Sequence, residues 1–253
     1  MNDPFRLDGS CVLVTGGTRG IGRAISLRLA RAGATVVANY ARNDEAAESL
    51  RAEAAQEQLS LEVLRADLTL PKGFAAALDR LQQCPDQTVS LVHCAATGVH
   101  RPLEELTNKH WDWTMALNVR VFFELVRSLL PLLREGSAIV ALSSAGAVRA
   151  VPAYSAIGAS KAALESVARH MAAELAPRGV RVNILSPGSV RTQAWDTFPD
   201  RDARLAEALR RSPIGRLVNV DEVAHAAQFL CSAASRGIVG HTLVVDGGAR
   251  IVD

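Results

Sequence analysis

The stretch VLVTGGTRGIGRAISLRLARAG, residues 12–33, passes from an apolar run through a glycine-rich turn into a segment of helical period. Its glycines Gly16, Gly20 and Gly22 have the spacing G-x-x-x-G-x-G between a predicted strand and a predicted helix. Glycines at such a turn let the backbone approach a diphosphate, whose charge faces the free N–H groups at the helix N-terminus. Glycines also end many strands without binding anything, but their position in the first βα unit favours nucleotide binding.

Beyond this unit, short apolar runs alternate with longer segments of helical period along the rest of the chain. The runs indicate buried parallel strands, and the longer segments indicate helices that cover both faces of the sheet. The predicted strands are residues 11–16, 35–40, 61–67, 89–96, 137–144, 181–188 and 241–248, and the predicted helices are residues 20–32, 43–58, 71–83, 107–134, 153–176 and 220–232. This order predicts a Rossmann-type, doubly wound α/β fold with a parallel seven-stranded sheet. Residues 1–253 are predicted to form a single domain with a lid insertion at about 193–215.

The end of the second predicted strand bears on which nucleotide is bound. An acidic residue there would hold a ribose 2′-hydroxyl and would repel a 2′-phosphate. The chain instead has Asn39 at this strand end, with Arg42 following it and Arg19 inside the glycine turn. Both arginines suit a 2′-phosphate through charge-assisted hydrogen bonds, which favours NADP(H) over NAD(H). In the alternative, Arg42 is a solvated residue and Asp44 takes the acidic role one turn later.

Composition argues against several classes of function. Hydrophobic residues make up 49% of the 253 residues and charged residues 21%, as in globular proteins with a substantial core. A formal net charge of +2, with Lys and Arg scattered along the chain, disfavours a nucleic-acid partner. No apolar run reaches about 18 residues and the N-terminus is polar, so neither a membrane span nor secretion is expected. The four cysteines lack a C-x-x-C pairing, which favours free thiols, a cytoplasmic location and no metal site.

Motifs spread over nearly the whole chain resemble those of the short-chain dehydrogenase/reductase family: TGGTRGIG at 15–22, AD at 66–67, LNV at 117–119, SS at 143–144 and SPGSVRT at 186–192. The resemblance implies an oxidoreductase in which Lys161 holds the nicotinamide ribose and lowers the pKa of a tyrosine that serves the substrate oxygen. It also implies that Ser144 and Asn118 support that tyrosine, and that Val190 and Thr192 hold the nicotinamide carboxamide. The remaining cofactor contacts that the resemblance adds to those above are Thr18, Ile21, Asp67, Leu68 and Gly188.

The tyrosine departs from the spacing found in the ketone-reducing members of this family. Those members carry Y-x-x-x-K, but the chain has Ile157 at that position and Tyr154 in the spacing Y-x6-K. Residues seven apart on a helix differ by about 20° around its axis, so Tyr154 is expected to share a face with Lys161. Relative to the usual position, it is displaced by about 4.5 Å along the helix axis.

The Y-x6-K spacing is similar to that of the enoyl-acyl-carrier-protein reductases of this superfamily. When a 2-enoyl thioester is reduced, hydride adds two carbons away from the carbonyl carbon and negative charge builds on a distant enolate oxygen, so the donor must lie farther out. Residues 98–119, GVHRPLEELTNKHWDWTMALNV, also resemble the NADPH-dependent type III bacterial enoyl-acyl-carrier-protein reductase. The resemblance therefore implies NADPH-dependent reduction of the C=C bond of a trans-2-enoyl thioester in fatty-acid or related acyl biosynthesis.

Two features leave other functions open. The family's Asn-Asn-Ala-Gly after the fourth strand is replaced by HCAA at 93–96, and Ser144 matches the serine of a ketone reductase. His93 is expected to be a satisfied strand residue and not a catalytic base. The first alternative is a carbonyl reductase that acts on a 3-oxoacyl or natural-product ketone. The second is a non-catalytic NADP-binding regulator, in which Tyr154 is only a packed aromatic residue.

The predicted lid, residues 193–215, lies where open α/β sheets receive their ligands. Trp195 and Phe198 are expected to cover an acyl chain. The arginines of this segment suit an acidic acyl carrier protein or a coenzyme A phosphate, and equally suit a solvated helix; they are Arg201, Arg204, Arg210 and Arg211. The resemblance also implies a homo-oligomer, a dimer or tetramer, with Trp111 and Trp113 expected in the core or at a subunit interface.

Overall fold

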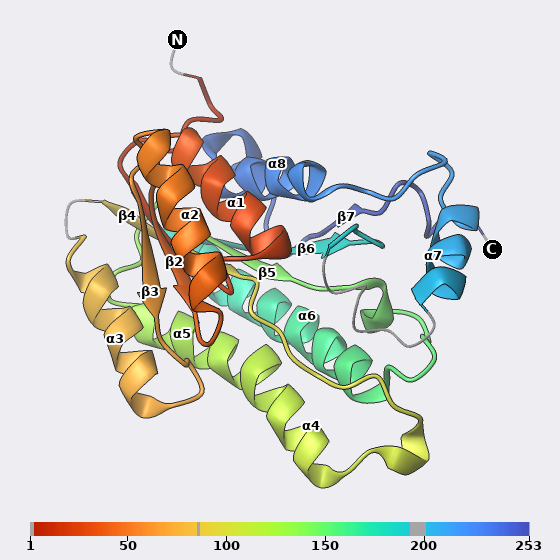
Figure 1. Cartoon of the computed structure of the whole chain (residues 1–253). Helices are drawn as coiled ribbons and strands as arrows, with labels where there is room; N and C mark the ends of the chain where they lie inside the picture. The colour runs from red at the N-terminus through yellow and green to blue at the C-terminus, as the bar shows by residue number, and fades with distance from the viewer. Residues whose placement is uncertain (1–2, 85–86, 193–200, 253) are drawn as a thin grey trace.

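The computed structural model describes residues 3–84, 87–192 and 201–252 (Figure 1). A seven-stranded, wholly parallel sheet runs through the described chain in the order β3-β2-β1-β4-β5-β6-β7. Its strands are β1 (Ser10–Thr15), β2 (Thr35–Tyr40), β3 (Leu61–Arg65), β4 (Thr88–His93), β5 (Ala138–Leu142), β6 (Arg181–Pro187) and β7 (Thr242–Val245). Each predicted apolar run overlaps one of these strands, so the predicted fold class is confirmed.

Helices cover both faces of the sheet in two layers (Figure 1). One layer contains α1 (Gly20–Arg31), α2 (Asp44–Gln56) and α8 (Val220–Cys231), and the other contains α3 (Pro71–Gln82), α5 (Val121–Leu129) and α6 (Ser155–Leu175). Within the predicted insertion, α7 (Arg201–Arg210) stands beyond the carboxyl ends of the strands. Trp195 and Phe198, the predicted acyl contacts, lie outside the described residues.

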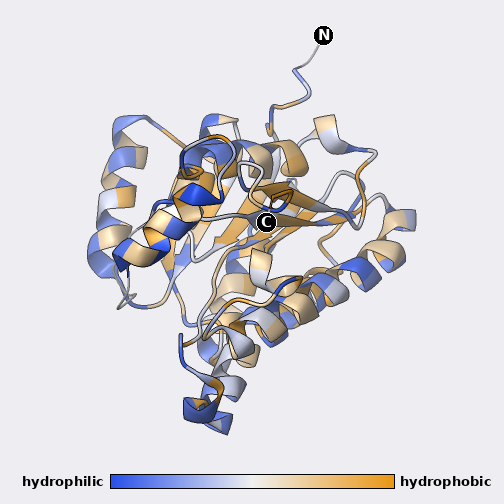
Figure 2. Cartoon of the chain, turned by 90° about the vertical axis from the view of Figure 1, so that its right-hand side faces the viewer, coloured by the Kyte–Doolittle hydropathy of each residue, from blue (hydrophilic) through white to orange (hydrophobic). Residues whose placement is uncertain are grey.

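The side chains of each strand alternate between two apolar clusters, one beneath each helix layer. Leu13 of β1 joins Phe122 of α5 and Leu164 of α6 in one cluster, and all three are fully buried. The next side chain back, Val12, joins Ile25 of α1 in the other cluster. Because both faces are covered, the strands are apolar at nearly every position, as parallel strands usually are. Figure 2 shows hydrophobic strands enclosed by helices with hydrophilic outer faces.

The direction of winding reverses between β1 and β4, which are neighbours in the sheet. The chain adds β2 and β3 on one side of β1, and then returns to add β4 to β7 on the other. The loops that follow β1 and β4 therefore diverge toward opposite faces at one edge of the sheet. Open α/β sheets bind their ligands in the crevice at such a reversal point.

The helix predicted at 107–134 is present over Asn108–Leu129 and contains a π turn that the sequence did not predict. Helix α4 (Asn108–Met115) passes into a π turn, Ala116–Arg120, before α5 begins. A π turn inserts one extra residue into the helical ladder and occurs frequently at functional sites. Here it carries Asn118, whose side chain reaches two other segments of the chain.

Within the described ranges, no helix has the length and apolar character to cross a membrane, and no three metal-ligating side chains gather into a group. Trp111 and Trp113 of α4 are 46% and 42% exposed. Their predicted placement in the core is therefore wrong, and the subunit interface stays a prediction for both.

A buried guanidinium anchors the C-terminus of α8 to the sheet. Arg181 at the start of β6 is buried and donates hydrogen bonds to the carbonyl oxygens of Leu230 (2.7 Å) and Ser232 (3.1 Å) and to the hydroxyl of Ser235 (2.7 Å). Burial lowers the pKa of Arg181 from its usual value. These carbonyls belong to the last turn of α8 and the turn after it, where a helix has no internal donors and where its dipole favours a cation.

We expect Arg181→Met to lower the free energy of unfolding by about 2–4 kcal/mol, because it removes the charge-assisted hydrogen bonds from a buried guanidinium to the carbonyl oxygens of Leu230 and Ser232. Urea unfolding followed by circular dichroism measures the change. Arg236→Met, at an exposed position in the same region, is the matched control and should change the free energy of unfolding by less than about 0.5 kcal/mol. Equal effects of the two substitutions would contradict the assigned role of Arg181.

Candidate active site

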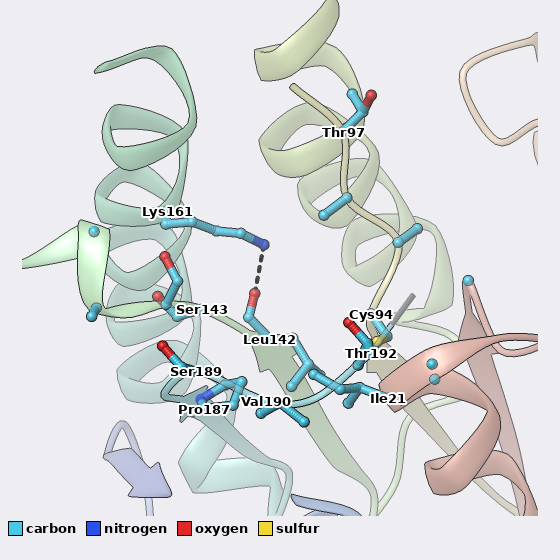
Figure 3. A pocket seen from close by; sticks show the side chains of 18 of the residues that line it. Ile21, Cys94, Thr97, Leu142, Ser143, Lys161, Pro187, Ser189, Val190 and Thr192 are labelled. Atoms are coloured by element: carbon cyan, nitrogen blue, oxygen red, sulfur yellow. Dashed lines mark hydrogen bonds between the residues drawn. The ribbon is translucent and has the colours of Figure 1, made fainter. Parts of the chain in front are cut away.

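A cavity of about 1310 Å³ opens at the carboxyl ends of the strands. Figure 3 shows part of its lining, with Lys161 and Ser143 on one side and Ile21 and Thr192 on the other. Every cofactor-binding residue predicted from the sequence lines this cavity. Of the predicted catalytic residues, Tyr154, Lys161 and Ser144 line it and Asn118 does not.

The glycine turn before α1 has the shape that a bound diphosphate requires. Gly16 and Gly20 adopt the positive φ angles +64° and +52°, and a Cβ atom at Gly22 would lie 2.1 Å from the carbonyl oxygen of Gly16. The N-cap residue Arg19 has an extended backbone and makes no side-chain cap, and the first turn of α1 has no acidic residue. The N–H groups at this helix terminus therefore remain available to an anion, and the turn fits the diphosphate of a dinucleotide.

Two arginines predicted to hold a 2′-phosphate line the cavity. Arg19 and Arg42 are exposed at the cavity, and neither has an ion-pair partner among the described residues. Asp44, the alternative ribose ligand, accepts a hydrogen bond from the hydroxyl of Tyr40 (2.9 Å) and pairs with Arg65 (3.1 Å). The carboxylate of Asp44 is therefore already engaged, which disfavours the alternative in which it holds the ribose.

Two other predicted cofactor contacts also shape the loops that they occupy. The buried Asn39 donates from Nδ2 to the carbonyl oxygens of Leu64 (3.3 Å) and Ala66 (2.8 Å), so its amide nitrogen ties the end of β2 to β3. Asp67 accepts from the backbone N–H (3.0 Å) and the hydroxyl (2.6 Å) of Thr69. Both residues line the cavity, and their hydrogen bonds also hold the loops on which they lie.

His93 replaces a family asparagine and stabilises the turn after β4. Thr15 Oγ1 accepts from the backbone N–H groups of Cys94 and Ala95, both at 3.1 Å, and lies 3.0 Å from His93 Nδ1. The hydroxyl proton is then left to donate to Nδ1, which assigns the imidazole proton to Nε2. Burial lowers the pKa of His93 to about 3, so the ring is neutral at neutral pH. These contacts satisfy Nδ1, but Nε2 is buried and has no hydrogen-bond partner among the described residues, so the prediction of a satisfied strand residue holds for only one of the two ring nitrogens.

Asn118, predicted to support catalysis, joins three segments behind the cavity. Its side chain is fully buried in the π turn, accepts from the backbone N–H of Thr97 (2.8 Å), and donates to the carbonyl oxygen of Thr97 and to Ser160 Oγ, both at 2.9 Å. These bonds connect the loop after β4, the π turn and α6. In this structure Asn118 is a positioning residue for the wall that carries Lys161.

Lys161 is a buried cation in the cavity wall. Its side chain is 5% exposed, and its Nζ donates to the carbonyl oxygen of Leu142 at the end of β5 (2.7 Å; Figure 3). Burial lowers the pKa of Lys161 to about 8, against smaller opposing effects of Cys94 and Glu165. The carbonyl oxygen therefore orients the ammonium toward the cavity. Burial removes solvent from the ammonium and so disfavours its charged form.

Tyr154 precedes α6 as its N-cap residue and does not lie within the helix, so the angular argument from helical spacing does not apply to it. Ala153 before it has φ +56°, and a Cβ atom at Gly146 would lie 2.5 Å from Tyr154 Cε1. The phenol ring is thus packed against the turn after β5. Its hydroxyl lies 3.3 Å from Ser144 Oγ, which brings two predicted catalytic hydroxyls together.

The predicted lowering of the tyrosine pKa by the lysine is wrong for this structure. Burial raises the pKa of Tyr154, with a smaller opposing effect of the hydrogen bond from Ser144, and Lys161 does not contribute. The Lys161 ammonium donates instead to the carbonyl oxygen of Leu142. Tyr154 is therefore a neutral phenol, and so a proton donor, at neutral pH.

Two further residues lie at the site, of which the analysis of spacing identified Ile157 and did not identify His100. Ile157, at the position of the ketone reductases' tyrosine, is buried against Gly98, where an added Cβ atom would lie 2.3 Å from its Cγ1. The imidazole of His100 lines the cavity and packs against the phenol of Tyr154, with ring centroids 5.3 Å apart. The only sequence signal for His100 is its place in the segment 98–119, which resembles the type III enoyl reductases.

Helix α7 brings the predicted lid arginines to the cavity mouth. Arg204 and Arg211 line the cavity together with Glu207. Glu207 pairs with Arg211 (2.5 Å) and with Arg210, so part of the positive charge of this helix is already compensated. The described part of the lid thus lies where a substrate would enter.

Comparison with known proteins agrees with this geometry. The family model described as "Enoyl-(Acyl carrier protein) reductase" matches residues 16–250. The 1-cyclohexenylcarbonyl-CoA reductase of Streptomyces collinus is 37% identical over 95% of this chain and 86% of its own length. The D-threitol dehydrogenase of Mycolicibacterium smegmatis is 36% identical over 98% of this chain and 95% of its own length.

Solved structures of similar sequence have the same fold. A short-chain dehydrogenase from Burkholderia cenocepacia J2315 in complex with NADP superposes with a TM-score of 0.87 at 34% identity, over 97% of this chain and 99% of that chain. A dehydrogenase/reductase from Sinorhizobium meliloti 1021 has a TM-score of 0.89 at 32% identity and covers 97% of each chain. The protein therefore belongs to the short-chain dehydrogenase/reductase family and is an oxidoreductase that depends on a nicotinamide dinucleotide.

Proposed function

We propose that this enzyme uses NADPH to reduce the C=C bond of a trans-2-enoyl thioester. The observation that carries the proposal is the position of the phenol: Tyr154 caps α6, while Ile157 fills the place of the tyrosine that ketone reductases use. A proton donor set back in this way suits an oxygen remote from the carbon that receives hydride. The relative 1-cyclohexenylcarbonyl-CoA reductase, by its name an enzyme for an unsaturated acyl thioester, supports the same assignment.

The chemistry of the reaction divides between the dinucleotide and the residues of the chain. A bound NADPH would supply the hydride to the β-carbon of the enoyl group, and a proton from solvent at the α-carbon would complete the saturated thioester. The Tyr154 hydroxyl donates to the thioester oxygen as enolate charge develops there, and Ser144, 3.3 Å away, adds a second donor. A positioned donor of this kind lowers the barrier by about 3–4 kcal/mol, judged from the removal of single oxyanion donors. Lys161 and the glycine turn bind and orient the ribose and the diphosphate.

The protonation states of these side chains suit reduction. Tyr154 carries its proton because burial raises its pKa, and Lys161 carries its positive charge below a pKa of about 8. His93, the last residue of β4, is neutral because burial lowers its pKa to about 3. At neutral pH Tyr154 therefore offers a proton to a developing enolate, and Lys161 offers a positive charge to the ribose.

Carbonyl reduction is the second candidate, and Ser144 is the observation that favours it. This serine lies at the end of β5 within hydrogen-bonding distance of Tyr154, as a serine and tyrosine that serve a ketone would. The relative D-threitol dehydrogenase, by its name an alcohol dehydrogenase, supports this candidate. Position 157 argues against it, since Ile157 offers no hydroxyl there.

The acyl group would be carried by coenzyme A or by an acidic acyl carrier protein. Arg204 of α7 and Arg211, which follows this helix, line the cavity and support a phosphate-bearing carrier of either kind. We also propose a homo-oligomer, for which the exposed Trp111 and Trp113 of α4 are the supporting observation.

Purified protein with NADPH should consume the reduced cofactor with crotonyl thioester and not with acetoacetyl thioester, as absorbance of NADPH measures. Consumption with acetoacetyl thioester alone would replace the proposal with the carbonyl reductase. NADPH binding without turnover of either thioester would indicate the non-catalytic regulator.

In the same assay, Tyr154→Phe should reduce crotonyl turnover by about 100-fold or more and leave the Kd for NADPH nearly unchanged. Ser155→Ala removes an exposed hydroxyl from the next residue and serves as the matched control, with activity close to that of the wild type. Wild-type turnover in Tyr154→Phe would remove the phenol from the mechanism.

The value of kcat/KM should be constant at neutral pH and fall above about pH 8, because Lys161 loses its charge as pH rises through its lowered pKa. A lysine with an ordinary pKa of about 10.4 would keep its charge across this range. Initial rates in buffers of constant ionic strength measure the profile. A profile that stays flat to pH 10 would show that the Lys161 charge is not required.

Arg42→Ala should raise the Kd for NADPH by about 10- to 100-fold and leave the Kd for NADH unchanged, because one charge-assisted pair with the 2′-phosphate is lost. Fluorescence titration measures both constants. Arg51→Ala is the control, since Arg51 lies on α2, pairs with Glu48 and does not line the cavity. An equal loss for NADPH and NADH would assign Arg42 to a part of the cofactor that both share.

A further inference from the structure

Two cysteines far apart in the sequence meet at the end of the sheet opposite the cavity. Cys11, the second residue of β1, and Cys84, which follows α3, are 73 positions apart, and their Sγ atoms lie 2.6 Å from each other. Their residues are 0% and 6% exposed. A disulfide has an S–S distance of about 2.05 Å, so the two sulfurs are close to bonding distance.

A positive charge lies beside one of the two sulfurs. Arg80, one turn before Cys84 on α3, has its Nη1 3.2 Å from Cys84 Sγ. Its side chain is 23% exposed and also pairs with Glu62, so it connects the buried sulfur with solvent. A guanidinium at this position stabilises negative charge on the sulfur, and thiolates are the reactive form of cysteine. Burial raises the pKa of Cys11 well above the ordinary value.

We propose that Cys11 and Cys84 form a reversible intramolecular disulfide when the protein meets a peroxide. The Cys84 thiolate attacks one peroxide oxygen, the O–O bond breaks, and the leaving hydroxide takes a proton to become water. The resulting sulfenic acid of Cys84 is attacked by the Cys11 sulfur, which forms the S–S bond and releases a second water. Two thiols and one hydrogen peroxide thus become one disulfide and two waters, with two electrons passing from the sulfurs to the peroxide.

The other two cysteines differ from this pair. Cys94 lines the cofactor cavity, and burial raises its pKa to about 11. Cys231 at the end of α8 is buried, and burial raises its pKa to about 12. Among the described residues, neither has a second sulfur in contact. The four cysteines are thus one pair and two isolated thiols, which makes the pattern of oxidation predictable.

The disulfide would join β1 to the end of α3 without touching the cavity. Cys11 lies four residues before the β1 terminus at Thr15, and the predicted cofactor contacts begin at Gly16. Cross-linking residues 73 positions apart restrains the unfolded chain more than the folded one. Peroxide would therefore make the protein more stable to heat while leaving the cofactor site unchanged.

The test is to treat the whole protein with hydrogen peroxide, denature it, and count the thiols that iodoacetamide modifies. Two of the four cysteines should be protected, dithiothreitol should restore all four, and peptide mass mapping should find Cys11 linked to Cys84. The oxidised protein should have a Tm higher by about 5 °C or more, and dithiothreitol should reverse this shift.

Two variants distinguish a disulfide between Cys11 and Cys84 from oxidation of the other two cysteines. After peroxide treatment, Cys84→Ala should leave all three remaining cysteines reactive to iodoacetamide, whereas the control Cys231→Ala should still protect two of its three. Mass mapping of the wild type does not depend on the folding of either variant. Modification of all four thiols after peroxide, a link between two chains, or sulfinic acid at Cys84 without a link would each overturn the proposal.

Discussion

Burial of both faces of a parallel sheet is the constraint on which the rest of this structure depends. Because all seven strands run in one direction, their carboxyl ends lie along one edge, and the helix layers leave that edge as the way in for a ligand. The segments after β1, β4 and β5 end there without strand partners, so their backbone groups and first side chains become the cavity wall. Gly16, Cys94 and Ser144 all reach the cavity for this reason.

Burial then determines the charges of Lys161 in the cavity wall and of His93 at the end of β4. The ammonium of Lys161 and the imidazole of His93 both lose solvent, and the pKa of each falls, to about 8 and about 3. The lysine still keeps its charge at neutral pH, while the histidine is neutral. Perturbed pKa values of this kind are common at functional sites, where catalytic groups are removed from solvent. The Asn118 hydrogen bonds hold the wall that makes this burial possible.

Much of the site was predictable from short spacings, because its residues follow directly after strands or begin helices. All the predicted cofactor residues line one cavity for that reason. The orientation of Tyr154 was not predictable, since it depends on Gly146 and His100, which the fold brings against the ring from other segments. The role of Asn118 also changed, because a π turn places its side chain between the loop at Thr97 and α6.

By itself, the sequence determined the order and number of strands, the two helix layers, the glycine turn and the family. These features depend on neighbouring residues, through side-chain periods of 2 and about 3.6 and the backbone freedom of glycine. Only the tertiary structure decided the pKa of Lys161, the cap that Arg181 forms on α8, and the contact of Cys11 with Cys84. Each of these depends on burial or on residues distant in the chain, and no local pattern of residues records which distant groups folding will bring together.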